Sequence, residues 1–373
     1  MQFQNVSIDA IGACLPESTW SSEQVETRLE PVYQRLRLPA GRLALMSGIH
    51  QRRVWEPGTM PSEASIRSGS AAIQASSIKP SQIGCLIHAS VCRDFLEPAT
   101  ASRVHHGLGL PADCWVYDVS NACLGLLNGV VQIATLIESG AIEAGLVVGT
   151  ENSRPLLEQT IAHLNADHSL TRRSIKPAFA SLTIGSGSCA ILLTHRRLAP
   201  GASRLRTAVA KARSAYHDLC RSDQDSAGAD MTPLMDTDSE KLLAAGVATG
   251  AEAFETFLTE SGWPRDVIDR SVCHQVGGRH RALMLEAMGL PVDRDVATFP
   301  WLGNTGSVAL PLTLAAGAFW NHIQPNQNVG LFGIGSGINS IMLGCEWQTT
   351  RVAGNFPAEQ PQFETLAAEA TLG

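Results

Sequence analysis

The sequence contains few aromatic residues, no block of basic residues and no long apolar segment. Aromatic residues make up 5% of the 373 residues, charged residues make up 17%, and the formal net charge is −7. An acidic chain without a basic cluster lacks the positive surface that nucleic-acid binding requires. The longest apolar stretch, 308–320, is shorter than the roughly 20 residues that a membrane-spanning helix needs. We therefore expect no nucleic-acid partner and no transmembrane segment.

The sequence also lacks the cysteine patterns of disulfide-rich and zinc-binding proteins. Its nine cysteines are an odd number and include no Cys-x-x-Cys pair. The adjacent His105 and His106 have no carboxylates or cysteines at metal-ligand spacing. The first residues show neither the basic nor the apolar region of a signal peptide. These features favour a reducing, cytoplasmic location and predict no metal site.

Two short motifs occur twice and indicate a duplicated chain. Ile-Gly-Ser-Gly stands at 184–187 and again at 334–337, and Ser-Val-Cys stands at 90–92 and again at 271–273. The offset of the second pair carries Cys123 onto Asn304, and both residues lie beside glycines. Repeats of this kind predict related structural units, so we expect two pseudo-symmetric halves.

Strand-like and helical segments alternate through both halves, which predicts an α/β layered fold. The first half has strand-like segments at 6–14, 83–91, 114–119 and 145–149 and helical segments at 21–35, 65–75, 99–108 and 124–138. The second half has helical segments at 241–261, 279–288 and 308–321 and strand-like segments at 270–273, 329–332 and 338–343.

The same pattern predicts the domain organisation. We expect an N-terminal half over 1–198, with an insertion near 151–181, and a C-terminal half over 199–350. The polar segment 204–238 is expected to be an irregular connection between the halves. The last segment, 351–373, loses all periodicity and is predicted to be a disordered tail.

Cys123 is the candidate nucleophile. It follows a strand-like segment and opens an apolar helix, where the positive end of the helix dipole favours thiolate and lowers the pKa of a thiol. The alternative interpretation is a small buried apolar cysteine, as expected for Cys14, Cys85 and Cys189.

His274 and Asn304 are the candidate partners of Cys123. His274 ends an apolar strand before a glycine turn, and ligand sites in α/β sheets gather where strands end. Asn304 lies in a glycine-flanked turn, which asparagine tolerates without any function. Each residue alone also fits a structural role. If the halves pack as symmetric copies, however, Cys123, His274 and Asn304 come together in one site.

The loop 93–98 contributes a fourth candidate, Glu97, which is either a catalytic carboxylate or a solvated acid ahead of Pro98. The Gly-Ser-Gly motifs complete neither the Gly-x-Ser-x-Gly of hydrolases nor the Gly-x-Gly-x-x-Gly of dinucleotide sites. Paired glycines instead allow backbone N–H groups to approach a reacting carbonyl and form part of an oxyanion hole.

Together these residues resemble the thiolase superfamily, in its β-ketoacyl-acyl-carrier-protein synthase III branch. The resemblance extends from residue 5 to residue 347, and its matching segments are 47–53, 118–125, 185–187, 274–275, 303–306 and 333–337. Within the branch, 92–98 and 121–124 are most similar to the enzymes that join two fatty acyl-CoA molecules head to head, the 2-alkyl-3-oxoalkanoate synthases. The resemblance implies a five-layered α-β-α-β-α fold of two pseudo-symmetric halves and a homodimer.

The resemblance also implies a role for each candidate residue. Cys123 would hold an acyl group covalently, and the backbone N–H groups of Cys123, Gly335 and Ser336 would bind the oxyanion. His274 and Asn304 would donate hydrogen bonds to the enolate of a second acyl thioester. Glu97 would reach into the partner subunit's site and abstract the α-proton of the second acyl thioester bound there. No cofactor would be bound permanently, because coenzyme A thioesters are the substrates.

The chain departs from the malonyl-using synthases at three places. It has Val276 and Gly277 where those enzymes have alanine and asparagine, and Arg42 and Met46 where they have a tryptophan and an arginine for the coenzyme A nucleotide. Arg52 and Arg53 remain as candidates for binding the anionic coenzyme, or the acyl donor arrives on a carrier protein.

Three other functions therefore stay open. They are decarboxylative condensation of a malonyl thioester with an acyl-CoA, acyl transfer to a nucleophile other than carbon, and acyl binding without catalysis.

Overall fold

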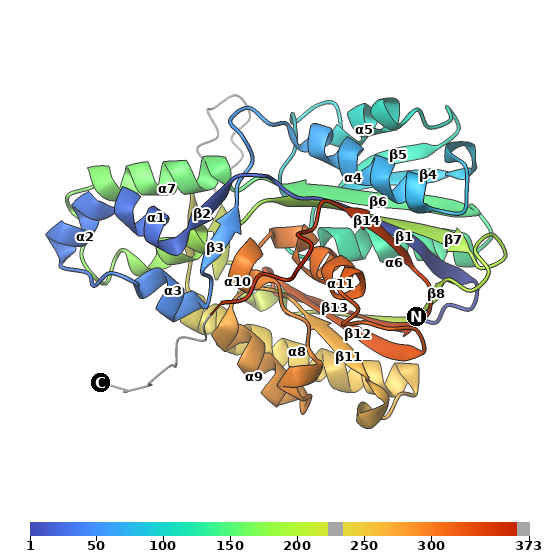
Figure 1. The fold of residues 1–373 in the computed structure, drawn as a ribbon. Coiled ribbons are helices and arrows are strands. Elements are labelled where there is room, and N and C mark those ends of the chain that lie inside the picture. Colours follow the sequence, from blue (N-terminus) through green and yellow to red (C-terminus); the bar gives the residue numbers. More distant parts are fainter. Residues whose placement is uncertain (223–233, 364–373) are drawn as a thin grey trace.

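The first half of the chain forms five strands of the main sheet and three helices that pack on them in the computed structural model, which describes residues 1–222 and 234–363 (Figure 1). These elements are β1 (Val6–Cys14), α4 (Pro61–Ala75), β4 (Cys85–Ala89), α5 (Thr100–Leu108), β5 (Trp115–Val119), α6 (Gly125–Glu138), β6 (Ala144–Glu151) and β7 (Gly187–His195). Each strand and helix expected in this half, apart from 21–35, is found within a few residues of its expected bounds.

The second half repeats this order of elements. It comprises β8 (Ser203–Ala212), α8 (Ser239–Ser261), β11 (Arg270–Cys273), α9 (Gly278–Met288), α11 (Ala309–Phe319), β12 (Gln327–Gly335) and β13 (Asn339–Trp347). Where the first half has β5, the second has a single parallel bridge between Ser271 and Asp295. The repeated order confirms that the two halves are related.

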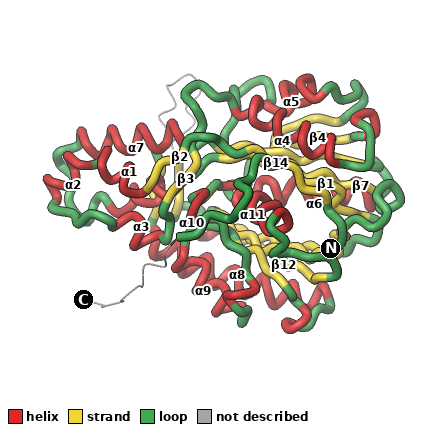
Figure 2. Tube along the Cα trace, in the orientation of Figure 1, coloured by secondary structure: helices red, strands yellow, loops and turns green. Residues whose placement is uncertain are grey.

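Helices and strands are arranged in five layers. The main sheet runs in the order β11-β12-β13-β8-β1-β7-β6-β4-β5. Its two halves meet at β1 and β8, which share only the pairs Ser7–Arg204 and Ile8–Ser203. Helices α4 and α5 cover the outer face of the first half, α8 and α9 cover the outer face of the second, and α6 and α11 lie between the two (Figures 1 and 2). The expected α-β-α-β-α fold is confirmed.

The middle layer is buried because its helices are apolar on nearly all sides. Along α11 nine of eleven residues are buried, and every residue of β1 is buried. Gly333 of β12 passes so close to α6 that a Cβ there would lie 2.6 Å from a methyl group of Leu127. This close packing fixes the start of α6 against the end of β12.

A side layer covers the ends of the strands that carry the candidate site. It consists of β2 (Thr19–Ser21), α1 (Ser22–Arg28), α2 (Glu30–Leu36), α3 (Arg42–Ser47), β3 (Gln51–Arg53), α7 (Arg154–Ala166) and the 3₁₀ helix η2 (Lys176–Thr183). Val25, Leu29 and Phe179 are among its buried residues. The expected single helix over 21–35 is wrong, because the chain turns at Leu29 and Pro31 then starts a second helix.

The prediction of an irregular connection over 204–238 is also wrong. Residues 203–212 form β8, which pairs with β13 and buries Leu205, Thr207, Ala208 and Val209, while Arg204 and Arg206 are only partly buried. The arginines make this strand, which lies between β13 and β1, appear polar in the sequence. The rest of the segment contains η3 (Ser214–Tyr216) and the hairpin β9 (Cys220–Ser222) and β10 (Met235–Thr237), and 223–233 lie outside the described residues.

The predicted disordered tail is wrong for residues 351–363. Strand β14 (Arg351–Gly354) pairs in parallel with β1, and the Asn355 side chain then bonds to both backbone groups of Leu15. Phe363 stacks on His50 with ring centroids 4.8 Å apart. Pairing with β1, rather than any local pattern, orders this segment, and 364–373 lie outside the described residues.

The two Ser-Val-Cys motifs are not structurally equivalent. His88 of β4 pairs with Val148, three residues before the end of β6, whereas Cys273 of β11 pairs with Phe332, three residues before the end of β12. By this register Cys273 corresponds to His88, so the motif 90–92 lies beyond the strand that its second copy occupies. The two halves are related, but the two Ser-Val-Cys motifs do not occupy equivalent positions in them.

The remaining elements are short. They are α10 (Phe299–Leu302) and the 3₁₀ helices η1 (Pro80–Gln82), η4 (Arg265–Val267), η5 (Val292–Arg294) and η6 (Gly306–Val308). Among the helices that the structure describes, none has the length and hydropathy to cross a membrane.

Candidate active site

Cys123 lies on a sharp turn between β5 and α6. The preceding residue, Ala122, has a positive φ of 44°, and the N–H of Leu124 donates to the carbonyl oxygen of Asn121 at 2.9 Å. A left-handed conformation at a non-glycine residue costs about 1–2 kcal/mol and persists only where the surroundings enforce it. The turn thus holds Cys123, which is partly buried, just ahead of the first turn of α6.

The expectation that the Cys123 thiol has a lowered pKa is wrong. Burial, the Glu151 carboxylate and the Cys220 thiol together raise its pKa to about 12. The helix dipole contributes about 0.3–1 kcal/mol, which is less than the 1.36 kcal/mol of one pKa unit. The thiol of the free protein therefore stays protonated at neutral pH.

Alkylation of Cys123 by iodoacetamide tests this protonation state. Because only the thiolate reacts, the rate is expected to rise steadily with pH through 8 to 10 without reaching a plateau. Mass spectrometry of the peptide that contains Cys123 measures the rate, with the Cys123→Ser protein as a blank. A plateau below pH 8 would contradict the raised pKa.

The end of β12 lies against the backbone of Cys123, as the sequence predicts for the second Ile-Gly-Ser-Gly motif. A Cβ at Gly335 would be 3.4 Å from the backbone nitrogen of Cys123 and 3.1 Å from Leu124 Cγ. Asn339 Nδ2 donates to Asn121 Oδ1 at 3.1 Å and so fixes the turn after β12 to the Cys123 loop. The roles of Cys123, Gly335 and Ser336 as oxyanion donors remain predictions that this proximity allows.

His274 lies directly after β11, at the same end of the sheet. Its N–H donates to the carbonyl oxygen of Phe332 at 3.1 Å, three residues before Gly335, and its side chain is buried. Burial and the neighbouring His280, whose ring centroid is 6.4 Å away, lower the pKa of His274 to about 3. A neutral imidazole at physiological pH carries one N–H donor, which is what hydrogen bonding to a thioester oxygen requires.

Asn304 is held by the first Ile-Gly-Ser-Gly motif. Its N–H donates to Thr183 O at 3.0 Å, and its carbonyl oxygen accepts from Gly185 N–H at 2.9 Å. Its Oδ1 accepts from Gly306 N–H at 3.1 Å. Among the described residues the Nδ2 group donates to no partner, so the amide is oriented with its N–H₂ available to a ligand.

Gly185 is required for this arrangement, because a Cβ there would lie 1.8 Å from the carbonyl oxygen of Leu302. Gly185→Ala is expected to displace the Asn304 turn and to lower enzymatic turnover at least tenfold, since small misplacements of reacting groups are costly. The matched control is Gly246→Ala on α8, whose Cβ would meet only Ile334 at 3.7 Å. Steady-state rates and thermal unfolding of both variants provide the comparison, and equal turnover in the two would contradict this role for Gly185.

No described hydrogen bond or ion pair joins Glu97 to the other candidate residues. Glu97 is exposed on the loop between β4 and α5 and makes no hydrogen bond or ion pair with other described residues. The loop itself is anchored by Asp94, which accepts from the N–H of Ser62 at 2.9 Å and pairs with Arg103 at 3.2 Å. The structure thus fixes the loop that carries Glu97 but leaves its carboxylate without a described partner.

Of the two arginines predicted to bind coenzyme A, Arg52 lies in the interior and Arg53 is partly buried. Arg52 is fully buried and donates to Trp20 O and Ser22 Oγ, and burial lowers its pKa to about 10. Arg53 donates to the carbonyl oxygens of Pro16 and Glu17. The prediction is wrong for Arg52 because its side chain turns inward, beneath the turn that carries Asn304.

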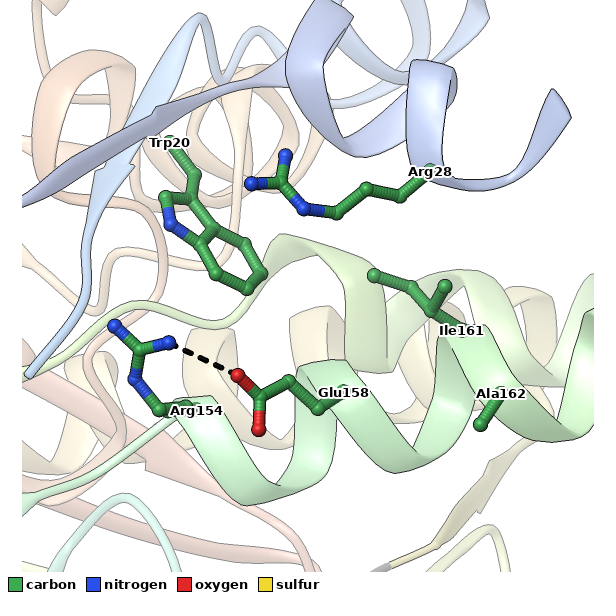
Figure 3. A pocket seen from close by; sticks show the side chains of 6 residues that line it. All are labelled: Trp20, Arg28, Arg154, Glu158, Ile161 and Ala162. Carbon is green, nitrogen blue, oxygen red and sulfur yellow. Dashed lines mark hydrogen bonds and ion pairs between the residues drawn. The ribbon is translucent and has the colours of Figure 1, made fainter. Parts of the chain in front are cut away.

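Two surface cavities lie apart from the candidate residues. One, of about 520 Å³, lies between α1 and α7 and is lined by Trp20, Arg28, Arg154, Glu158, Ile161 and Ala162 (Figure 3). The other, of about 450 Å³, includes Trp55 and Arg67. Neither is lined by Cys123, His274 or Asn304. Within 1–222 and 234–363 no cluster of three potential metal ligands occurs.

Sequence reasoning missed Glu151, the last residue of β6. Its side chain is buried, it raises the pKa of Cys123, and it accepts a hydrogen bond from Ser307 Oγ at 2.5 Å. Ser307 is three residues after Asn304, so Glu151 joins the surroundings of Cys123 to the Asn304 turn. A carboxylate that ends a continuous apolar strand was the available signal, since such a residue is rarely buried without partners.

Comparison with known proteins agrees with this geometry. Residues 45–179 match the family model for the thiolase N-terminal domain, and residues 258–347 match the one for the 3-oxoacyl-[acyl-carrier-protein] synthase III C-terminal region. An acyl-CoA:acyl-CoA alkyltransferase of Shewanella oneidensis is 36% identical over 93% of this chain and 100% of its own length. One of Xanthomonas campestris is 32% identical, with the same coverage.

A solved structure extends the similarity to three dimensions. Xanthomonas campestris OleA, in a crystal structure with bound lauric acid and lauroyl-CoA, has a TM-score of 0.87 and 31% identity, covering 92% of this chain and 100% of its own. The likeness in sequence and in fold spans both halves. The chain belongs to the family of the acyl-CoA:acyl-CoA alkyltransferases, which has the thiolase fold.

Proposed function

We propose that this chain is an acyltransferase that joins two fatty acyl-CoA molecules head to head into a 2-alkyl-3-oxoacyl product. The observation that carries the proposal is the match over the full length of an acyl-CoA:acyl-CoA alkyltransferase. Because the related OleA was solved with lauroyl-CoA, a long-chain acyl-CoA is the proposed substrate. The glutamate and the cysteine replaced in solved OleA variants have the same spacing in that chain as Glu97 and Cys123 have here.

The first proposed step forms an acyl-enzyme. The sulfur of Cys123 attacks the carbonyl carbon of an acyl-CoA, the new C–S bond replaces the old one, and coenzyme A leaves with the thiol proton. Splitting the condensation in this way replaces one difficult step by two easier ones. The backbone N–H of Cys123 and the adjacent end of β12 are placed to stabilise the tetrahedral oxyanion.

The second proposed step forms the carbon–carbon bond. Glu97 removes an α-proton from a second acyl-CoA, and the N–H groups of neutral His274 and of Asn304 stabilise the enolate oxygen. The α-carbon then attacks the acyl carbonyl on Cys123, and the Cys123 thiolate leaves. The product keeps the coenzyme A of the second substrate. No permanently bound cofactor is proposed, because both steps use groups of the protein and its thioester substrates.

Glu97 is proposed to act in the site of a partner subunit within a homodimer. Its loop exposes two large apolar side chains, Phe95 (53%) and Leu96 (52%), and the neighbouring strand β5 exposes a third, Trp115 (59%), at its other end. Trp115 lies on β5, an edge strand of the main sheet with unpaired backbone groups. Exposed apolar residues on an open edge favour a second copy of the chain as the partner.

Mixed dimers test the exchange of Glu97 between subunits. Coexpressed Cys123→Ser and Glu97→Gln chains each lack one group, yet half of randomly formed dimers combine an intact Cys123 with an intact Glu97 across the interface. We expect roughly a quarter of wild-type condensation, because one of two sites in half of the dimers is complete. Each variant alone should be nearly inactive. If the mixed dimer were inactive as well, Glu97 would act within its own chain or not at all.

The main alternative is decarboxylative condensation of a malonyl thioester, which the match to the synthase III C-terminal region favours. Loss of carbon dioxide creates the carbanion without a base, so Glu97→Gln would then retain activity. Transfer to a nucleophile other than carbon would release coenzyme A without forming a 2-alkyl-3-oxoacyl product. A carrier protein as acyl donor is tested by comparing acyl-carrier and acyl-CoA substrates. A cytoplasmic location is proposed from the nine free cysteines, which suit a reducing compartment.

A further inference from the structure

We propose that Glu151 is a positioning residue that fixes the Asn304 turn beside Cys123 and anchors the start of the loop whose Glu97 serves the partner subunit's site. The inference rests on the proposed function, since it concerns the same site. No contact of Glu151 with the substrate or the reacting atoms is proposed. Glu151 acts through the two segments that it binds.

One carboxylate receives hydrogen bonds from both segments. Its Oε1 accepts from Ser307 Oγ at 2.5 Å, Val91 N–H at 3.1 Å and Ser307 N–H at 3.3 Å. Its Oε2 accepts from Cys92 N–H at 3.4 Å. Val91 and Cys92 begin the loop that ends at Glu97, whereas Ser307 ends the turn that begins at Asn304. Charged acceptors make the stronger hydrogen bonds, so this junction is the main polar link between the two segments.

The surroundings of Glu151 leave the carboxylate little freedom. The side chain is 5% exposed, and Trp55 Nε1–H donates to its backbone carbonyl oxygen at 3.0 Å. Gly306 has a φ of +54°, and a Cβ there would come within 3.1 Å of Glu151 Cγ. The absence of a side chain at Gly306 therefore allows the turn to close on the carboxylate.

Glu151 also affects the nucleophile through its charge. It is the second cause, after burial, of the raised pKa of Cys123. A negative charge beside the thiol favours its protonated form. Glu151 thus affects both the placement of the condensing groups and the reactivity of the free thiol. Removing its charge should impair the placement and increase the reactivity of the thiol.

Glu151→Gln separates the two properties because it keeps the size of the side chain and removes its charge. We expect the condensation rate to fall about 10- to 100-fold, as is typical when a supporting residue of a site is lost. We expect the rate of Cys123 alkylation at pH 8 to rise about tenfold or more, since removal of a like charge increases the thiolate fraction. Glu143→Gln, on an exposed glutamate just before the other end of β6, is the control and should change neither.

The Ser307→Ala variant tests the link between Glu151 and the Asn304 turn independently. It removes the hydroxyl donor and leaves the carboxylate in place, so condensation should fall while the alkylation rate at pH 8 stays at the wild-type value. A wild-type condensation rate in this variant would overturn the proposal, and so would an unchanged alkylation rate in a folded Glu151→Gln protein. Alkylation needs no acyl substrate, so that readout remains valid if the wild-type protein does not condense acyl-CoA. Thermal unfolding of each variant shows whether it is folded.

Discussion

Replacing Cys123 by serine is expected to lower the condensation of acyl-CoA by about 10⁴-fold or more, with no acyl group retained on the protein. A serine hydroxyl is a far weaker nucleophile than a thiol, and no described group is bonded to Cys123 Sγ that would activate an alkoxide in its place. The free protein already keeps the thiol protonated because burial and the Glu151 carboxylate raise its pKa. Acylation at position 123 therefore depends on the greater nucleophilicity of sulfur.

The test of this first prediction is product formation from lauroyl-CoA, followed by mass spectrometry of the 2-alkyl-3-oxoacyl product and its decarboxylated ketone. Cys220→Ser is the matched control, because Cys220 is a partly buried thiol whose charge influences Cys123. It should retain condensation within a few-fold of wild type. Substantial product from Cys123→Ser would show that the condensation does not pass through this residue.

His274→Ala and Asn304→Ala are each expected to lower condensation by about 10²- to 10³-fold, because each removes one donor to the enolate oxygen. The two losses should not add in the double variant, since both groups serve one oxygen atom. Acylation of Cys123 precedes the enolate and should continue. Coenzyme A release should therefore show a single burst, equal to the number of sites, without further turnover.

Rapid mixing with lauroyl-CoA and a thiol-specific dye distinguishes this outcome from a general loss of structure. A variant that is misfolded shows no burst, whereas one that lacks only the enolate donors shows a full burst. His322→Ala, at an exposed histidine bonded to Gln360, is the control and should behave as wild type. Loss of the burst in folded His274→Ala and Asn304→Ala would place these residues in acylation instead.

The sequence predicted the layered fold well because the apolar strands and helices dominate the pattern. Strand β1 is buried along its whole length, and α11 is apolar on all sides, so neither needed information from distant residues. Strands β8 and β14 were missed because their pairing with β13 and β1, rather than their composition, determines their structure. Tertiary pairing of this kind leaves little trace in a local window.

The candidate site shows the same division. Cys123, His274 and Asn304 were found through the duplication and the resemblance, and the structure places all three on loops next to strand ends or helix starts. The prediction that Arg52 binds coenzyme A was wrong, because it rested on the charge of the residue, whereas its side chain is buried. The raised pKa of Cys123 could not be anticipated, because its causes, burial first and then the Glu151 carboxylate of β6, arise from tertiary packing.

The first Ile-Gly-Ser-Gly motif has a supporting role. Gly185 N–H donates to Asn304 O, and Thr183 O, just before the motif, accepts from Asn304 N–H. The first motif supports Asn304 of the second half, and the second motif lies against Cys123 of the first half. Cys123 of the first half is therefore supported by β12 of the second half, and Asn304 of the second half is supported by Gly185 of the first half.

The most direct test of the covalent mechanism is the intact mass of the Glu97→Gln protein after incubation with lauroyl-CoA. Without the base for the second step, the acyl-enzyme should accumulate. The account predicts one lauroyl group per chain, located by peptide mapping on Cys123, and the release of an equal amount of coenzyme A. A lauroyl group on another residue, or coenzyme A release from a protein that carries no acyl group, would contradict it.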